Sequence, residues 1–230
     1  MPKKEAAASE SVSASTTDAP QGAALAEPLA SESMPGWARR AGLFLTAQTI
    51  SMFGSFLVQY AILWHLTLTT KSGFILALAA IFGFLPQAIV SIFAGVWADR
   101  VNRKTMIIVA DASIAAATLG LAFLMLSGVD DLWLIFLVMA VRSIGAGIQM
   151  PAVSAVIPQI VPSDKLMRIN GINSSIQSAL GLLAPVAAAG VYSTMSLEAI
   201  LFIDVVTAII GVSLLATIAV PSLARVASAE

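Results

Sequence analysis

Three ionisable residues stand inside long apolar stretches of the sequence, where side chains of these types could carry protons: Asp111, Arg142 and Asp204. Arginine deep in an apolar segment is costly, so it usually faces a polar cavity or a partner group. A carboxyl group in a low-dielectric environment holds its proton more tightly, which suits reversible protonation during ion-coupled transport. We therefore predict that these three residues couple proton movement to transport. A surface-anchored arginine and hydrogen-bonded structural carboxyl groups are the alternatives.

Neutral polar residues recur at helical spacing in three of the apolar stretches. Spacings of three, four, seven and eight residues place side chains on one face of a helix. We predict that these polar faces line one substrate cavity, with hydrogen bonding between packed helices as the alternative. The predicted cavity residues are Gln48, Ser51, Ser55, Gln59, Gln149, Asn170, Asn173, Ser174 and Gln177.

A short charged segment, residues 95–104, lies between two of the apolar stretches. Its glycine permits close helix approach, its aspartate can accept charge-assisted hydrogen bonds, and its three cations supply donors. One interpretation is topological, because loops on the cytoplasmic side of a membrane are basic. That interpretation does not explain an acidic residue directly before the cations. We therefore predict a gating loop that contains Gly95, Asp99, Arg100, Arg103 and Lys104.

The composition excludes several classes of protein. With 58% hydrophobic and 11% charged residues and a mean hydropathy of +0.92, the chain is far more apolar than a soluble domain. A formal net charge of −1 leaves no basic excess for binding nucleic acid. The sequence has no cysteine, one histidine and none of the common phosphate-binding, zinc-helix or nucleophile motifs. We expect a membrane protein with no enzymatic activity, no metal site and no cofactor.

Six apolar stretches are each long enough to cross about 30 Å of hydrocarbon as a helix. The sequence therefore predicts an all-α membrane protein with six transmembrane helices. The fourth stretch contains Pro151 and Pro158, so we expect a kink or an early end near Met150. The approximate limits of the six stretches are residues 42–68, 74–97, 106–127, 132–160, 169–193 and 197–220.

Lysine and arginine residues concentrate at alternate ends of the apolar stretches. Lys71 alone lies on the opposite side, together with acidic residues. Because basic residues are retained on the cytoplasmic side, both termini are predicted to be cytoplasmic. The expected regions are a disordered cytoplasmic tail (1–36), a six-span bundle (37–225) and a short cytoplasmic tail (226–230). The basic residues on the predicted cytoplasmic side are Arg39, Arg40, Arg100, Arg103, Lys104, Lys165, Arg168 and Arg225.

Two motifs resemble those of the major facilitator superfamily of transporters. The run Gly95-x-x-Ala98-Asp99-Arg100-x-x-Arg103-Lys104 resembles the loop signature between the second and third spans of that family, and it stands at the same place here. Residues 142–147, Arg-Ser-Ile-Gly-Ala-Gly, resemble the family's intramembrane arginine motif. Asn102 stands where the family usually has glycine. Since asparagine tolerates positive φ better than most residues, we expect the turn to be retained.

The later part of the sequence carries a series of spaced residues: Met150, Pro151, Pro158, Ile160-Val161-Pro162, Asn170-Gly171, Ala184-Pro185 and Gly190. With these residues it is similar to the drug and siderophore exporter branch of this family, which contains macrolide-efflux pumps. The fifth span departs from the exporter motif because Ala184 precedes Pro185 where that motif has glycine. Ala188 and Ala189 likewise take the places of a later glycine pair. These small residues preserve the capacity for close helix packing.

The resemblance implies the amino-terminal half of a twelve-span transporter, built as a three-plus-three inverted repeat. It further implies proton-coupled efflux of a small amphipathic compound such as a drug or siderophore. Alternating access requires two such bundles, so we expect the chain to be truncated or completed by a second six-span bundle on the same or a separate chain. The alternative is a non-transporting membrane interaction module or a partner subunit. Membrane lipid, a small-molecule substrate and protons are the other expected partners, and the cell membrane is the expected location.

Overall fold

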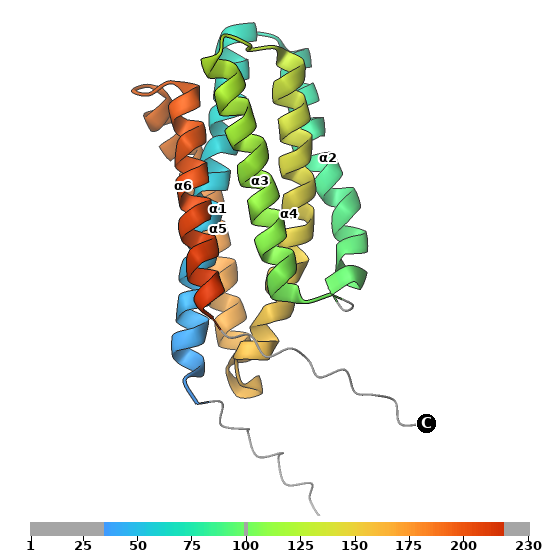
Figure 1. Cartoon of the computed structure of the whole chain (residues 1–230), viewed down its shortest axis with the longest axis vertical. Helices are drawn as coiled ribbons and strands as arrows, with labels where there is room; N and C mark the ends of the chain where they lie inside the picture. Colours follow the sequence, from blue (N-terminus) through green and yellow to red (C-terminus); the bar gives the residue numbers. More distant parts are fainter. Residues whose placement is uncertain (1–34, 99–100, 219–230) are drawn as a thin grey trace, which may run out of the picture. The chain divides into compact units, whose positions relative to one another are not determined.

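The computed structural model describes residues 35–98 and 101–218, which belong to one structural unit of the chain. Figure 1 shows the long helices of this part. Six helices are each long and apolar enough to cross a membrane, so the six predicted spans are confirmed. The predicted tails lie outside the described residues, apart from residues 35 and 36. In chain order the elements are α1 (Trp37–Thr70), α2 (Gly73–Ala98), α3 (Arg103–Leu126), α4 (Leu132–Ile160), the 3₁₀ turn η1 (Ser163–Lys165), α5 (Leu166–Tyr192) and α6 (Leu197–Thr217).

Left-handed backbone conformations end two of the helices sharply. α1 ends at Lys71, whose φ is 49° and whose N–H donates back to the last turn of the helix. α3 is followed by Gly128, whose φ is 85° and whose N–H donates to the Met125 carbonyl at 2.9 Å. The next N–H, that of Val129, donates to the Leu124 carbonyl at 3.0 Å. These two bonds form a Schellman motif, which allows α4 to begin after a short connection.

Asn102 forms the turn before α3, but not in the predicted way. Its φ is −62°, so tolerance of positive φ is not what the position requires. The side-chain oxygen instead accepts hydrogen bonds from the N–H groups of Lys104, at 3.0 Å, and Thr105, at 3.3 Å. Asn102 is therefore the N-cap of α3 and satisfies two backbone donors that would otherwise lack a partner.

α4 continues through both of its prolines, so of the kink or early end expected near Met150, the early end is wrong. An interior proline removes one backbone hydrogen bond and costs about 3 kcal/mol. Burial of the neighbouring side chains offsets this cost, because hydrophobic burial contributes about 1.5–3 kcal/mol for each large side chain. The buried residues around the two prolines are Ala152, Val153, Val156, Ile157 and Ile160.

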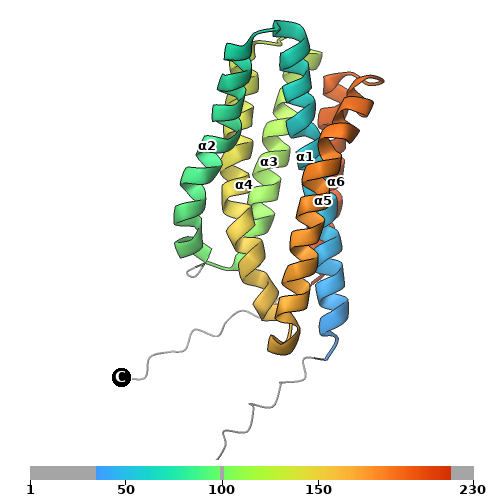
Figure 2. The same cartoon turned by 180° about the vertical axis from the view of Figure 1, so that it is seen from behind.

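The helices pack as two groups of three. In one group α4 lies between α2 and α3, as Figures 1 and 2 show from opposite sides. In the other group α1 packs against both α5 and α6, which barely touch each other. The groups meet where α3 packs against α6. These pairings are preserved when α1 is exchanged with α4, α2 with α5, and α3 with α6. The two repeats are therefore α1–α3 and α4–α6, and they differ from the two packing groups. Because each repeat has three helices, exchanged helices run in opposite directions, as an inverted repeat requires.

Buried apolar side chains form two clusters, one toward each end of the bundle. The first combines the beginnings of α1 and α3 with the ends of α4 and α6. The second combines the ends of α1 and α3 with the beginnings of α4 and α6. Buried polar residues lie in the helix segments between the clusters, where the candidate site is found. They are Gln48, Ser51, Asp111, Thr118, Arg142, Ser143, Gln149, Asn173 and Asp204.

α2 and α5 are the most peripheral helices of the described bundle. In the most apolar part of each helix, only 11% of α2 and 17% of α5 is buried. The corresponding share is 33–50% for the other four helices. Large apolar side chains project from both helices, among them Phe74, Ile92, Leu182 and Val186. These surfaces suit contact with lipid hydrocarbon.

Substitution of Gly147 tests a close approach between α2 and α4. A Cβ atom at this position would lie 2.8 Å from the Gln87 carbonyl oxygen and 3.1 Å from the Gln87 Cα atom, and backbone atoms cannot move aside easily. We expect Gly147→Ala to lower the free energy of unfolding by about 1–3 kcal/mol. The measurement is thermal unfolding of the purified chain in detergent.

Gly181→Ala in α5 is the matched control, because a Cβ atom there would meet nothing within 4 Å. Alanine favours helix over glycine, so this variant should be as stable as the unsubstituted chain or slightly more stable. Equal melting temperatures for the two variants would contradict the proposed contact.

Candidate functional site

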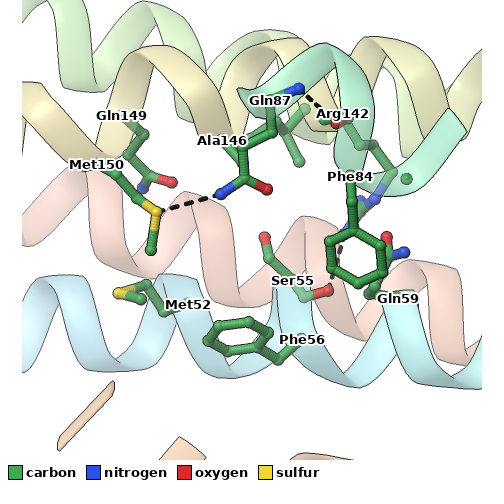
Figure 3. Close-up of a pocket in the computed structure, with 13 residues that line it drawn as sticks. Met52, Ser55, Phe56, Gln59, Phe84, Gln87, Arg142, Ala146, Gln149 and Met150 are labelled. Carbon is green, nitrogen blue, oxygen red and sulfur yellow. Dashed lines mark hydrogen bonds between the residues drawn. The ribbon is translucent and has the colours of Figure 1, made fainter. Parts of the chain in front are cut away.

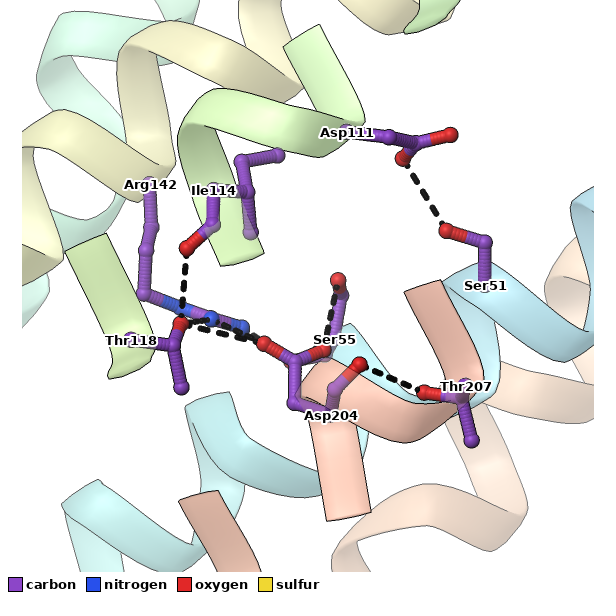
Figure 4. Close-up of polar contacts among 8 residues, drawn as sticks. All are labelled: Ser51, Ser55, Asp111, Ile114, Thr118, Arg142, Asp204 and Thr207. Carbon is purple, nitrogen blue, oxygen red and sulfur yellow. Dashed lines mark hydrogen bonds and ion pairs between the residues drawn. The ribbon is translucent and has the colours of Figure 1, made fainter. Parts of the chain in front are cut away.

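Arg142 lies near the middle of α4 and forms an ion pair with Asp204 of α6 (Figure 4). The two side chains are almost completely buried, with 4% and 0% of their surfaces exposed. The guanidinium group also donates to Thr118 Oγ1 of α3 and, through Nη2, to the Ser55 carbonyl of α1 at 3.0 Å. The arginine therefore faces partner groups on three other helices and does not extend to the membrane surface.

The Asp204 carboxylate has partners on both oxygens. Ser55 Oγ donates to Oδ1 at 3.1 Å, and Thr118 Oγ1 lies 3.1 Å from Oδ2, the oxygen that also meets Arg142 (Figure 4). α1, α3, α4 and α6 thus all contribute to one polar centre. Such partners offset the cost of burying an ion pair, although Arg142 Nε is buried without a hydrogen-bond partner among the described residues.

Asp111 of α3 is the second buried carboxyl group, with 2% of the residue exposed. Its Oδ1 accepts hydrogen bonds from Ser51 Oγ of α1 at 3.0 Å (Figure 4) and from Gln149 Nε2 of α4 at 2.6 Å. Its Oδ2 has no hydrogen-bond partner among the described residues. Asp111 therefore receives only neutral donors, whereas Asp204 receives a cation.

A pocket of about 100 Å³ lies among α1, α2 and α4, with one residue from α3 (Figure 3). Its apolar wall contains two phenylalanines and two methionines, and its polar groups are amides, hydroxyls and the edge of the arginine. Such a mixed lining suits an amphipathic small molecule. The lining residues are Met52, Ser55, Phe56, Gln59, Gly83, Phe84, Gln87, Ile114, Arg142, Ser143, Ala146, Gln149 and Met150.

The pocket takes in only some of the predicted cavity residues. Ser55, Gln59 and Gln149 line it, whereas Gln48 and Ser51 are buried but do not. The polar face of α5 contributes nothing to this pocket. Of its residues, Asn173 is buried, Gln177 is half-buried, and the remaining two, Asn170 and Ser174, are exposed.

Gln87 of α2 is a pocket residue that sequence reasoning missed. Its N–H donates to Ser143 Oγ of α4 at 2.9 Å, and its side-chain Nε2 donates to Met150 Sδ at 3.2 Å (Figure 3). It follows Pro86 directly in an otherwise apolar helix. A single amide next to a proline inside an apolar span was the available signal, because both features interrupt the span where another group can approach.

The predicted gating loop lies partly outside the described residues, because Asp99 and Arg100 are not described. Gly95 is exposed near the end of α2. Arg103 Nη1 donates to the Ala155 carbonyl of α4 at 2.8 Å. Lys104 Nζ donates to the carbonyls of Ala216, at 2.9 Å, and Ile218, at 2.8 Å, at the end of α6. A cation at a helix C-terminus satisfies unpaired carbonyls and complements the helix dipole.

The two buried carboxyl groups should differ in how much they contribute to stability. Asp204→Asn leaves the Arg142 guanidinium buried without a counter-charge, so we expect a loss of about 3–5 kcal/mol in the free energy of unfolding. Asp111→Asn keeps an oxygen that can accept from Ser51 and Gln149, so we expect a change within about 1.5 kcal/mol. Thermal unfolding in detergent measures both, and a larger loss for the Asp111 variant would contradict the assignment.

Among the described residues, no three His, Cys, Asp or Glu side chains are grouped as a metal site would require.

Comparison with known proteins points to transport. The chain is 35% identical over 192 residues to macrolide efflux protein A of Streptococcus pyogenes. The matched segment is 84% of this chain and 47% of that protein. A protein of the same name from Enterococcus faecalis is 36% identical over 144 residues, which cover 63% of this chain and 45% of that protein.

The chain spans about half the length of these curated relatives. The uncharacterized MFS-type transporter YvqJ of Bacillus subtilis is 26% identical over 139 residues, 60% of this chain and 33% of that protein. A family model described as Major Facilitator Superfamily matches residues 44–229, which include nearly all of the helical bundle. The chain is thus a multi-pass membrane protein that belongs to the major facilitator superfamily of transporters.

Proposed function

We propose that this chain forms one six-helix half of an exporter that moves a small amphipathic compound out of the cell in exchange for protons. The observation that carries the proposal is the position of the buried Arg142–Asp204 pair beside the pocket. Arg142 and Ser55 belong to both, since each lines the pocket and contacts the Asp204 centre. A change in the charge of the carboxyl group would therefore be felt directly at the pocket wall.

The proposed substrates are amphipathic drugs, with macrolides as the first compounds to test and siderophores as a second group. Two relatives carry the name macrolide efflux protein A, which supports this choice. The pocket supports it as well, because phenylalanine and methionine side chains provide an adaptable apolar wall beside several amide and hydroxyl groups. Half of the binding surface would come from the second bundle.

The proposed proton carriers are Asp204 and Asp111, with Arg142 as the residue that organises the Asp204 centre. A proton on Asp204 would remove the negative charge that holds the guanidinium group, so the four helices that meet there would be held less tightly. Uptake on one side of the membrane and release on the other would then bias the two access states. A ligand can shift such an equilibrium only by its differential affinity for the two states.

The second bundle, on the same or a separate chain, is part of the proposal because alternating access requires two bundles that move against each other. The loop of residues 95–104 would close the cytoplasmic side in one state, with Asp99 as the residue that meets the second bundle. Arg103 and Lys104 bind carbonyls of α4 and α6, which supports a role in fixing the loop to its own bundle. The distribution of basic residues supports cytoplasmic termini and the cell membrane as the location.

Proton-driven transport should depend on Asp204. In inside-out vesicles from cells that lack other exporters, with the second bundle present, we expect Asp204→Asn to lower macrolide uptake by about tenfold or more under an imposed proton gradient. That factor corresponds to about 1.4 kcal/mol or more. Uptake equal to that of the unsubstituted protein would remove Asp204 from the coupling mechanism.

Ser154→Ala is the matched control on α4. Ser154 is exposed and its hydroxyl donates to the Met150 carbonyl of its own helix. Uptake should be unchanged in this variant. Vesicles are compared at equal amounts of inserted protein, so that a loss of uptake is not confused with a loss of folding.

The proposed orientation can be tested with single cysteines because the chain has none of its own. We expect Asp130→Cys, between α3 and α4, to react with a membrane-impermeant maleimide on intact cells. Ser163→Cys, between α4 and α5, should react only after the membrane is permeabilised. Both positions are exposed in the structure. The reverse pattern of labelling would place the termini outside the cell.

A further inference from the structure

The two buried aspartates occupy corresponding positions in the two three-helix repeats. Asp111 of α3 and Asp204 of α6 are 93 positions apart. Ile114 and Thr207, one turn further along the same helices, are also 93 positions apart. α3 and α6 are the helices that exchange under the inverted repeat, so this common offset aligns one helix on the other.

The packing of neighbouring helices follows the same correspondence. A Cβ atom at Gly54 of α1 would collide with the Thr207 side chain of α6, and a Cβ atom at Gly145 of α4 would collide with the Ile114 side chain of α3. Gly54 and Gly145 are 91 positions apart. The contact of α1 with α6 therefore corresponds to the contact of α4 with α3, with a glycine of one helix against a side chain of the other in both cases.

The partners of the two carboxyl groups also correspond, but they differ in charge. Ser51 of α1 and Arg142 of α4 are 91 positions apart, the same offset as the glycine pair. Ser51 donates to Asp111, and Arg142 donates to Asp204. One repeat therefore places a guanidinium group where the other places a hydroxyl group.

The Asp111 site lacks the positive charge that its counterpart has. Asp111 Oδ2 is buried and has no partner among the described residues, and neither does Gln48 Oε1, which lies one turn before Ser51 on α1. Both atoms are hydrogen-bond acceptors. The ion pair of Asp204 and Arg142 lies in the same polar layer, whereas the direct contacts of Asp111, Ser51 and Gln149, are neutral. A buried carboxylate without a counter-charge is unfavourable.

We propose that Asp111, together with Ser51, Gln149 and Gln48, forms a binding site for one small exchangeable cation, a proton or Na⁺, which takes the place of the guanidinium group in the other repeat. Carboxylate, amide and hydroxyl oxygens suit either a shared proton or a hard cation. This inference rests on the proposed ion-coupled transport and identifies where the ion binds. Asp204 already has a guanidinium counter-charge beside it, whereas Asp111 has none, so the added cation binds at Asp111.

Two features connect this site to the rest of the proposed mechanism. Ser51 and Ser55 are one turn apart on α1, and each donates to one of the two carboxyl groups. Gln149 and Arg142 are two turns apart on α4, and both line the pocket. A ligand that draws the Gln149 amide away from Asp111 would change the affinity of the site for the cation, and the reverse effect must be equal.

Binding measurements on the purified chain in lipid nanodiscs test the proposal with two probes. In sodium-free buffer at neutral pH, a bound proton gives an infrared band of a protonated carboxyl group. In the other arm, a bound sodium ion gives saturable binding of ²²Na⁺. We expect one of the two signals, and we expect Asp111→Asn to remove it. Neither signal in the unsubstituted chain, or a signal that persists in full in Asp111→Asn, would overturn the site.

A second pair of variants introduces the missing charge without changing Asp111. Gln149→Lys places an ammonium group near Asp111 Oδ1, so it should abolish the cation signal. Gln149→Met has a similar length and no charge, but it loses the hydrogen bond to Asp111, so it should weaken the signal without abolishing it. A full signal in the lysine variant, with native elution and helix content, would contradict the inference.

The outcomes separate this site from the proposed transport function. A chain that binds the cation but, with the second bundle present, shows no gradient-driven efflux would refute the proposed antiport and keep the site. Gradient-driven efflux with no cation signal at Asp111 would refute the site and keep the antiport.

Discussion

The structure depends on the enclosure of one guanidinium group within the membrane span. A lone arginine in hydrocarbon is costly, so the helices must supply both a counter-charge and acceptors for its remaining donors. Asp204 supplies the counter-charge, and Thr118 and the Ser55 carbonyl supply the acceptors. Asp204 belongs to the same repeat as Arg142, whereas Thr118 and Ser55 belong to the other, so the hydrogen bonds of the guanidinium group hold the two repeats together. It also explains why the apolar clusters lie at the two ends of the bundle, on either side of this polar layer.

The sequence predicts the features that hydropathy and charge determine. Six spans follow from the length of apolar stretches, because nothing shorter than about 20 residues crosses the hydrocarbon as a helix. Asp111, Arg142 and Asp204 could be identified as buried polar centres because ionisable groups within a span must find partners. Helical spacing also placed Ser55 and Gln59 on one face of α1, and both line the pocket. Local patterns determine each of these features.

What could not be predicted depends on which helix covers which face. The polar residues between 170 and 177 share a face of α5, but spacing alone does not say which neighbour that face meets, and in the described bundle it stays away from the pocket. Gln87 enters the pocket because Gly147 lets α2 approach α4 closely, a tertiary effect. The role of Asn102 differs from the prediction for another reason. A residue tolerant of positive φ is also a good N-cap, so its type alone did not distinguish the two roles.

The contact of Lys104 with the last carbonyls of α6 has a mechanical consequence. The end of a helix normally frays easily, because its final carbonyls lack partners within the helix. Here two of those carbonyls, of Ala216 and Ile218, are held by the first turn of α3. A pull on the chain beyond Ile218 is therefore transmitted to α3, across the boundary between the two repeats, before the last turn of α6 unwinds. Tension applied at that point is therefore shared between the end of α6 and the start of α3.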